Sequence, residues 1–234
     1  MDTARERAAA VLIAVATALG IVALVIPLFL NPVWVGFEQG RAEAAAWTGY
    51  AEPDLRAATD AILADLVLGP PDFDVRVAGE PVLNDREREH MRDVRSVFLG
   101  FFVAAGLLVA GSVAVALARR SDPVGRDRTW RAVRSGAVGL VVGLLVVGGF
   151  AFIAFDVLFE LFHRLFFAGG SYTFDPATER LVQLFPFRFW QETAIVLGGA
   201  AIIVAGLVAL VAQRRIGRSR AASPVTQALA EPAP

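Results

Sequence analysis

The sequence lacks cysteine, and all 22 of its basic residues are arginine. Without cysteine the chain has no disulfide, thiolate nucleophile or thiolate-bound metal centre, and without lysine it has no Schiff-base chemistry. The 22 basic and 23 acidic residues give a net charge of −1, so no overall positive field exists to hold nucleic acid. Only His90 and His163 remain as side chains that ordinarily titrate near neutral pH.

Apolar residues, in contrast, are abundant: 56% of the 234 residues are hydrophobic before glycine is counted, whereas about 45 to 50% is usual for soluble proteins with glycine included. Four long and almost uncharged runs can each cross a hydrocarbon core of about 30 Å as a helix. The first run could instead be a signal peptide, but it is too long and is followed by bulky residues, which favours a membrane anchor. We therefore predict a mainly α-helical integral membrane protein with a four-helix transmembrane bundle, an extracytoplasmic cap of short helices and a small strand pair. The spans are predicted at residues 9–30, 96–118, 135–158 and 193–213.

The arginines predict how these spans are oriented, because positively charged loops stay in the cytoplasm. Residues 119–134 hold six arginines against two acids, and the tail, residues 214–234, holds four against one. Residues 31–95 hold seven arginines against thirteen acids, and the other outer segment, predicted at 159–192, is also acid-rich. Both termini, residues 1–8 and the tail, are therefore predicted to be cytoplasmic, and both histidines extracytoplasmic. The proline- and alanine-rich part of the tail after Arg220 is typical of disorder.

The spans contain almost no ionisable residues, which disfavours a transporter or proton pump. Gly139 and Gly143 have the small-xxx-small spacing that lets helices pack closely, either within the bundle or between two copies of the chain. Packing within the bundle is the interpretation we favour.

The outer segments contain signals for short elements. An apolar helical face and the Gly69-Pro70-Pro71 stop predict a helix over residues 52–68, and a short strand pair or an extended ribbon is expected over residues 73–83. Asn84 with Glu87 three residues later is typical of a helix start, so the second span should extend outward to about Asp85. A further short helix is expected to begin at Asp175-Pro176, among aromatic residues that suit the membrane surface.

The two histidines are predicted to lie at one depth. His90 precedes the apolar run of the second span by six residues and His163 follows that of the third by eight, so straight helices would place both imidazoles about 9 to 12 Å beyond the core. Asp93 is one turn from His90, and Glu160 and Asp156 share a stripe with His163. The alternatives are a solvated helix face for His90, a structural hydrogen bond for His163, or a metal held by both. Ser96 and Ser171 are weak nucleophile candidates.

Two sequence blocks resemble a four-span bacterial membrane family that includes lipoprotein intramolecular transacylases. Residues 87–94, EREHMRDV, are similar to its E-x-x-H-[LM]-x-D-V signature just before the second span. Residues 162–167, FHRLFF, followed by YTFDP at 172–176 and LVQLFP at 181–186, resemble its second signature. The chain differs where the family commonly has tryptophan, aspartate and an acidic residue, at Tyr172, Glu179 and Phe187.

The resemblance implies an enzyme of the bacterial cytoplasmic membrane that needs no cofactor and no metal, with its site on the extracytoplasmic side. It would move an acyl chain from the diacylglyceryl group of a lipoprotein to the α-amine of the N-terminal cysteine, so its partners are such lipoproteins and membrane lipids. The alternatives are a histidine-dependent ester hydrolase and a non-enzymatic membrane scaffold. The expected catalytic residues are His90 and His163; the supporting residues are Asp93, Glu160, Asp156 and Glu87; the substrate or oxyanion candidates are Arg86, Arg92, Arg164 and Tyr172.

Overall fold

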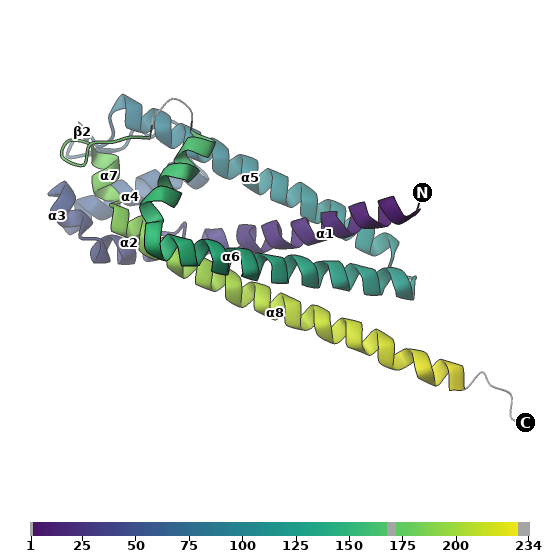
Figure 1. Ribbon diagram of the computed structural model, residues 1–234. Coiled ribbons are helices and arrows are strands. Elements are labelled where there is room, and N and C mark those ends of the chain that lie inside the picture. The colour runs from purple at the N-terminus through teal and green to yellow at the C-terminus, as the bar shows by residue number, and fades with distance from the viewer. Residues whose placement is uncertain (1, 168–171, 229–234) are drawn as a thin grey trace, which may run out of the picture. The chain divides into compact units, whose positions relative to one another are not determined.

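The computed structural model describes residues 2–167 and 172–228. Four long helices account for most of this chain, and shorter elements follow the first and third of them (Figure 1). The long helices are α1 (Asp2–Val25), α5 (Asp85–Ala118), α6 (Pro123–Phe166) and α8 (Phe187–Ala228). The short elements are η1 (Ile26–Leu28), α2 (Pro32–Arg41), α3 (Ala44–Thr48), α4 (Glu52–Val67), β1 (Arg76–Val77), β2 (Glu80–Pro81) and α7 (Arg180–Leu184).

Four helices in the described residues are long and apolar enough to cross a membrane: Thr3–Leu28, Asp85–Ala118, Pro123–Phe166 and Phe187–Ile216. Large apolar side chains along them remain exposed, for example Leu107 at 70% and Val146 at 68%. Such a surface suits a lipid environment. The predicted fold class, a four-span helical membrane protein with a small strand pair, is confirmed.

The chain divides into two compact units. The first comprises Met1–Ala23, Val103–Val146 and Gly199–Pro234, and its described residues form parts of the four long helices and the turn between α5 and α6. A Cβ at Gly136 would lie 2.2 Å from the carbonyl oxygen of Ala14, so α1 and α6 pack directly against each other at this glycine. Gly139 and Gly143, whose spacing predicted close packing, have nothing within 4 Å of a Cβ in the described residues. Near the N-terminus, Glu6 pairs with Arg119 and Arg128 at 2.9 and 3.3 Å.

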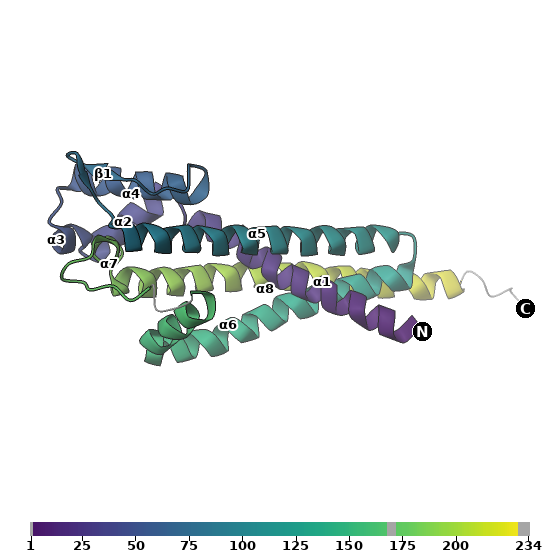
Figure 2. The same cartoon turned by 90° about the horizontal axis from the view of Figure 1, so that it is seen from above.

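The second unit, Leu24–Phe102 and Val147–Gly198, contains the short elements and most of the buried core. Asn31 caps α2 by accepting the backbone N–H groups of Val33 and Trp34, with Pro32 in the first turn. Helix α2 packs on α4, α3 packs on α7, and β1 pairs with β2 in an antiparallel ribbon against α4 (Figure 2). Met91, in the second turn of α5, belongs to the same buried core.

The helix and strand boundaries agree with those predicted from local sequence signals, with three exceptions. Helix α5 begins at Asp85, as the Asn84 and Glu87 signal predicted. Helix α7 begins only at Arg180, because Asp175 starts a turn in which its carbonyl oxygen accepts the N–H groups of Thr178 and Glu179. Each strand has only two residues. Helix α8 continues to Ala228, into the part of the tail that was predicted to be disordered after Arg220; the remaining six residues lie outside the described part.

Candidate functional site

His90 lies in the second turn of α5 and is only 5% exposed. Two phenylalanine rings cover it: the centroid of Phe167 is 4.8 Å from that of the imidazole, and the centroid of Phe174 is 5.3 Å away. The Nδ1 atom of His90 is buried and has no hydrogen-bond partner among the described residues. A buried nitrogen without a partner is costly, so this atom is available to a ligand that supplies one.

His163 reaches the same place because α6 is not straight. Ala154 has non-helical backbone angles, φ −143° and ψ 56°, and beyond it α6 turns sharply toward the start of α5 (Figure 1). The Nδ1 atom of His163 lies 2.7 Å from the carbonyl oxygen of Phe159, one turn earlier. The rings of Phe159 and Tyr172 flank the imidazole at 4.1 and 5.0 Å. The break, rather than a straight extension of the span, therefore carries this histidine to α5.

The two imidazoles face each other. Their centroids are 6.1 Å apart and their planes differ by 20°, although the residues are 73 positions apart in sequence. Phe167 contacts both rings, at 4.8 Å from His90 and 5.5 Å from His163. The structure thus brings the two predicted histidines into one apolar enclosure, which strengthens hydrogen bonds and charge interactions made inside it.

The acidic residues predicted to support the histidines make no hydrogen bond to either imidazole within the described residues. Glu160 accepts hydrogen bonds from Arg164 at 2.8 Å and from the Tyr172 hydroxyl at 3.1 Å. A carboxylate was expected to hydrogen-bond the ring of His163, but the Nδ1 atom of this ring is hydrogen-bonded to the carbonyl oxygen of Phe159 instead. Asp93 and Asp156 are exposed, with no hydrogen bond or ion pair made by their side chains to other described residues.

Glu87 has a local structural environment. Its Oε2 atom accepts the Asn84 N–H at 2.7 Å, while Asn84 Oδ1 accepts the Glu87 N–H at 2.9 Å, which is a capping box. Its Oε1 atom accepts the N–H of Leu181 at 2.6 Å, in the first turn of α7. Glu87 therefore joins the start of α5 to the start of α7.

The arginine candidates differ in their contacts. Arg86 forms an ion pair with Glu179, Arg164 pairs with Glu160, and Arg92 is exposed. Sequence reasoning did not assign Glu179 to the site, although it is only 8% exposed. Burial acts to raise the pKa of Glu179, but hydrogen bonds from Arg86, the Asp175 N–H and Asn84 outweigh it and hold the pKa below its ordinary value. No three metal-ligating side chains gather anywhere within residues 2–167 and 172–228.

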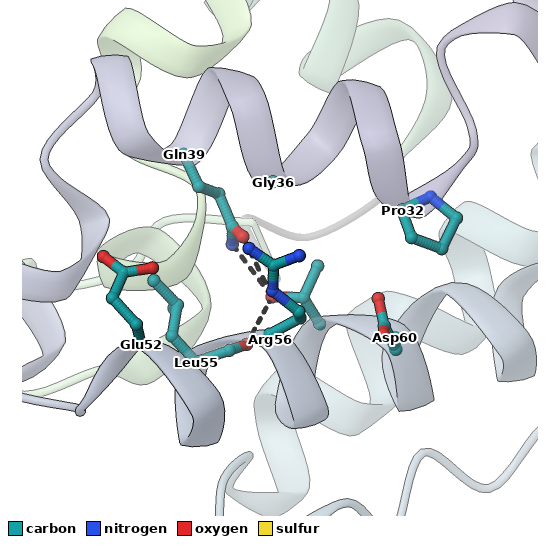
Figure 3. Close-up of a pocket in the computed structure, with 8 residues that line it drawn as sticks. Pro32, Gly36, Gln39, Glu52, Leu55, Arg56 and Asp60 are labelled. Atoms are coloured by element: carbon teal, nitrogen blue, oxygen red, sulfur yellow. Dashed lines mark hydrogen bonds between the residues drawn. The ribbon is translucent and has the colours of Figure 1, made fainter.

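A second buried polar cluster joins α2 to its neighbours. Gln39 donates from Nε2 to Thr59 at 3.0 Å and to the Leu184 carbonyl group at 2.9 Å, beside a shallow pocket between α2 and α4 (Figure 3). Next to it, Glu38 is 1% exposed, and its Oε1 atom has no partner among the described residues. Burial, together with a hydrogen bond to Glu192 and the charge of that residue, raises the pKa of Glu38 to about 7.

Stability is therefore expected to depend on pH through Glu38. A carboxyl group whose pKa is raised by folding stabilises the protein when protonated, and this contribution is lost as the pH rises from 4.5 through about 7. We expect the melting temperature of the detergent-solubilised protein to fall by about 3 to 6 °C between pH 5.5 and pH 8.5. Glu38→Gln, which keeps a hydrogen-bond donor, should remove most of this fall, whereas the exposed Glu80→Gln should retain it. An equal fall in both variants would contradict the assignment.

Known proteins resemble this chain in sequence and in structure. The family described as lipoprotein intramolecular transacylase Lit matches residues 11–190 of the chain. An uncharacterized protein of Aquifex aeolicus (strain VF5) is 30% identical over 119 residues, and the match spans about half, 49%, of that relative. The membrane integral lipoprotein intramolecular transacylase Lit from Bacillus cereus has a similar structure, with a TM-score of 0.73 and 15% identity over 93% of this chain and 99% of that one. A histidine-to-arginine variant of the same protein gives a TM-score of 0.73 and 15% identity over 95% and 96% of the two chains. At this level of identity the structural similarity shows the fold.

Proposed function

The chain belongs to the lipoprotein intramolecular transacylase family, and we propose that it moves one acyl chain from the glyceryl group of a diacylglyceryl-modified lipoprotein to the α-amine of the same N-terminal cysteine. The product is a lyso-form lipoprotein. The observation that carries the proposal is the pair of imidazoles 6.1 Å apart inside an aromatic enclosure. Two such groups can supply both the base and the acid that this transfer requires.

His163 is suited to the role of general base. A carbonyl oxygen can only accept a hydrogen bond, so the Nδ1 atom beside Phe159 carries the proton of the neutral ring. The Nε2 atom is then left with a free lone pair. The attacking amine, with an ordinary pKa of about 7.7 to 8.0, is partly neutral near pH 7, and it loses a proton to His163 as its nitrogen forms a bond to the ester carbonyl carbon.

His90 is suited to the role of acid. Its buried and unpartnered ring nitrogen can hydrogen-bond the substrate at the carbonyl or glyceryl oxygen. When the bond between the carbonyl carbon and the glyceryl oxygen breaks, His90 protonates the departing oxygen. The proton that His163 took from the amine passes to the other nitrogen of the His90 ring in the same step, so His90 stays neutral and the amide and the free glyceryl hydroxyl form without a net change in either histidine.

The two reacting groups belong to one substrate molecule, which reduces what the protein must supply. Alignment of groups already joined covalently can lower a barrier by up to about 7 to 11 kcal/mol. This agrees with a site of few catalytic groups. In line with the arginine distribution, we propose that both termini are cytoplasmic and that the histidines work at the outer surface of the membrane, where lipoprotein esters are found.

Hydrolysis is the competing activity, with water in place of the amine. The aromatic enclosure and the 5% exposure of His90 favour transfer, because water has little access to the ring. The test is expression in a bacterial strain that lacks N-acylation of lipoproteins, followed by mass spectrometry of the N-terminal peptide of a reporter lipoprotein. We expect one acyl chain relocated to nitrogen at unchanged total mass. Loss of one chain would indicate a hydrolase, and an unchanged diacylglyceryl peptide would contradict both activities.

A further inference from the structure

Phe174 is held between a guanidinium group and an imidazole. The Cζ atom of Arg86 lies 5.0 Å from the centroid of the Phe174 ring, and the centroid of His90 lies 5.3 Å from it, with the two ring planes at 67°. Arg86 and His90 are one turn apart on α5, whereas Phe174 belongs to the segment that precedes α7. Contacts of this kind are attractive and depend on orientation, so Phe174 is fixed against His90 from one side by Arg86.

Arg86 is itself anchored by one buried carboxylate. Glu179 is 8% exposed; its two oxygens accept hydrogen bonds from Arg86, and they also accept the Asp175 N–H at 2.6 Å and Asn84 Nδ2 at 3.3 Å. This carboxylate therefore ties the segment that carries Phe174 to the first turn of α5. Its hydrogen bonds within the described residues include neither imidazole, so any influence on His90 passes through Arg86 and Phe174.

We propose that Glu179 and Arg86 are positioning residues that hold Phe174 against His90, fix the plane of that imidazole and keep water from its Nδ1 atom. The role in turnover rests on the proposed function. Because Nδ1 has no partner among the described residues, the surrounding rings are what determines its orientation. If Phe174 were released, water would satisfy this nitrogen and the ring would be free to rotate.

His163 provides an internal reference. It is held by the carbonyl group of Phe159 at 2.7 Å and by the ring of the same residue at 4.1 Å, both on its own helix. Loss of the Glu179 carboxylate should therefore change His90 and leave His163 nearly unchanged. A merely structural role for Glu179 predicts a lower melting temperature with both histidines affected alike.

The chain contains only two histidines, so each can be followed in the purified full-length protein. Diethyl pyrocarbonate modifies accessible imidazoles, and mass spectrometry of peptides gives a separate rate for each residue when the affinity tag contains no histidine. We expect Glu179→Gln and Arg86→Met to raise the rate at His90 at least about fivefold, the scale of one lost cation–π contact, with His163 within about twofold.

Three further variants sharpen this experiment. Glu179→Asp keeps the charge and should restore much of the protection, Phe174→Leu should reproduce the exposure of His90, and the Glu179→Gln/Arg86→Met double variant should be no more reactive than either single variant. Arg131→Met, which removes an exposed ion pair with Asp127 on α6, is the matched control and should change neither rate. An unchanged rate at His90, or equal rises at both histidines, would overturn the proposal.

Turnover gives the second readout. A displaced catalytic ring commonly costs about tenfold or more in rate, so Glu179→Gln should lower kcat by about that factor with KM nearly unchanged. A variant with exposed His90 and full turnover would refute the positioning role. If the wild-type protein neither transfers nor hydrolyses the ester, the proposed function fails instead, and the modification rates still decide whether Glu179 protects His90.

Discussion

Replacing His163 with alanine is expected to lower acyl transfer by about 10²- to 10⁴-fold, the usual contribution of a general base. The reason is the orientation set by Phe159, which leaves the Nε2 atom of the imidazole as the proton acceptor. His90→Ala should have a similar effect. Because the two rings act on one proton cycle, the double variant should be little slower than the slower single variant. Initial rates with a synthetic diacylglyceryl lipopeptide in detergent, followed by mass spectrometry, measure this.

An asparagine substitution separates the chemical role of His163 from its structural one. The shorter amide side chain can still donate a hydrogen bond to the Phe159 carbonyl group, but it offers no basic nitrogen in place of Nε2. We therefore expect His163→Asn to be folded and as inactive as His163→Ala, and added imidazole to restore part of the activity of the alanine variant. Glu89→Gln, an exposed change beside His90, is the control. Wild-type rates in His163→Asn would contradict the role of general base.

The parts of this architecture that depend on neighbouring residues were predictable from the sequence. The apolar spans follow from length and composition, and the start of α5 follows from the capping box formed by Asn84 and Glu87, whose hydrogen bonds join residues three positions apart. The resemblance and the depth argument both selected His90 and His163, and the structure places these rings together.

The break at Ala154 was not predictable by the same means. The usual sequence causes of a helix kink are proline and glycine pairs, and position 154 has neither, although Gly148 and Gly149 precede it by six and five residues. Spacing along straight helices predicts one depth for the two histidines but does not describe how they meet. The glycines of α6 could not be assigned from spacing either. Spacing shows which glycines share a helix face, but it does not show which face meets a neighbouring helix. In the structure Gly136, rather than Gly139, makes the close approach to α1.

Long-range contacts account for what else was missed. Helical spacing placed Glu160 near His163, but the side chain of Glu160 turns to Arg164 and Tyr172. The ion pair between Arg86 and Glu179 joins residues 93 positions apart, and no local pattern indicates it. In the sequence, the one feature that drew attention to position 179 was the glutamate in place of the aspartate that the family commonly has there. The site is thus organised by tertiary contacts that its sequence blocks do not contain.

Glu87→Ala is expected to destabilise the protein by about 2 to 5 kcal/mol, because it leaves the buried N–H group of Leu181 without a partner and removes the capping bond to the N–H group of Asn84. For a chain of this size the loss corresponds to a fall in melting temperature of about 5 to 15 °C. Glu87→Gln keeps one acceptor oxygen and should lose about half as much. Thermal unfolding in detergent measures both, and the exposed Glu89→Gln serves as the matched control.

The same variants decide whether Glu87 supports the histidines directly or through the fold. Its carboxylate oxygens are occupied by the backbones of α5 and of the first turn of α7, and its hydrogen bonds within the described chain include neither imidazole. At temperatures well below its melting point, Glu87→Gln should therefore retain transfer within about threefold of the wild type. This limit corresponds to about 0.7 kcal/mol of lost transition-state stabilisation, because 1.4 kcal/mol corresponds to a tenfold change in rate. A thermally stable Glu87→Gln protein with a hundredfold loss of transfer would instead show that this carboxylate takes part in the chemistry. The residue would then be acting on the substrate, and the capping box would be its secondary role.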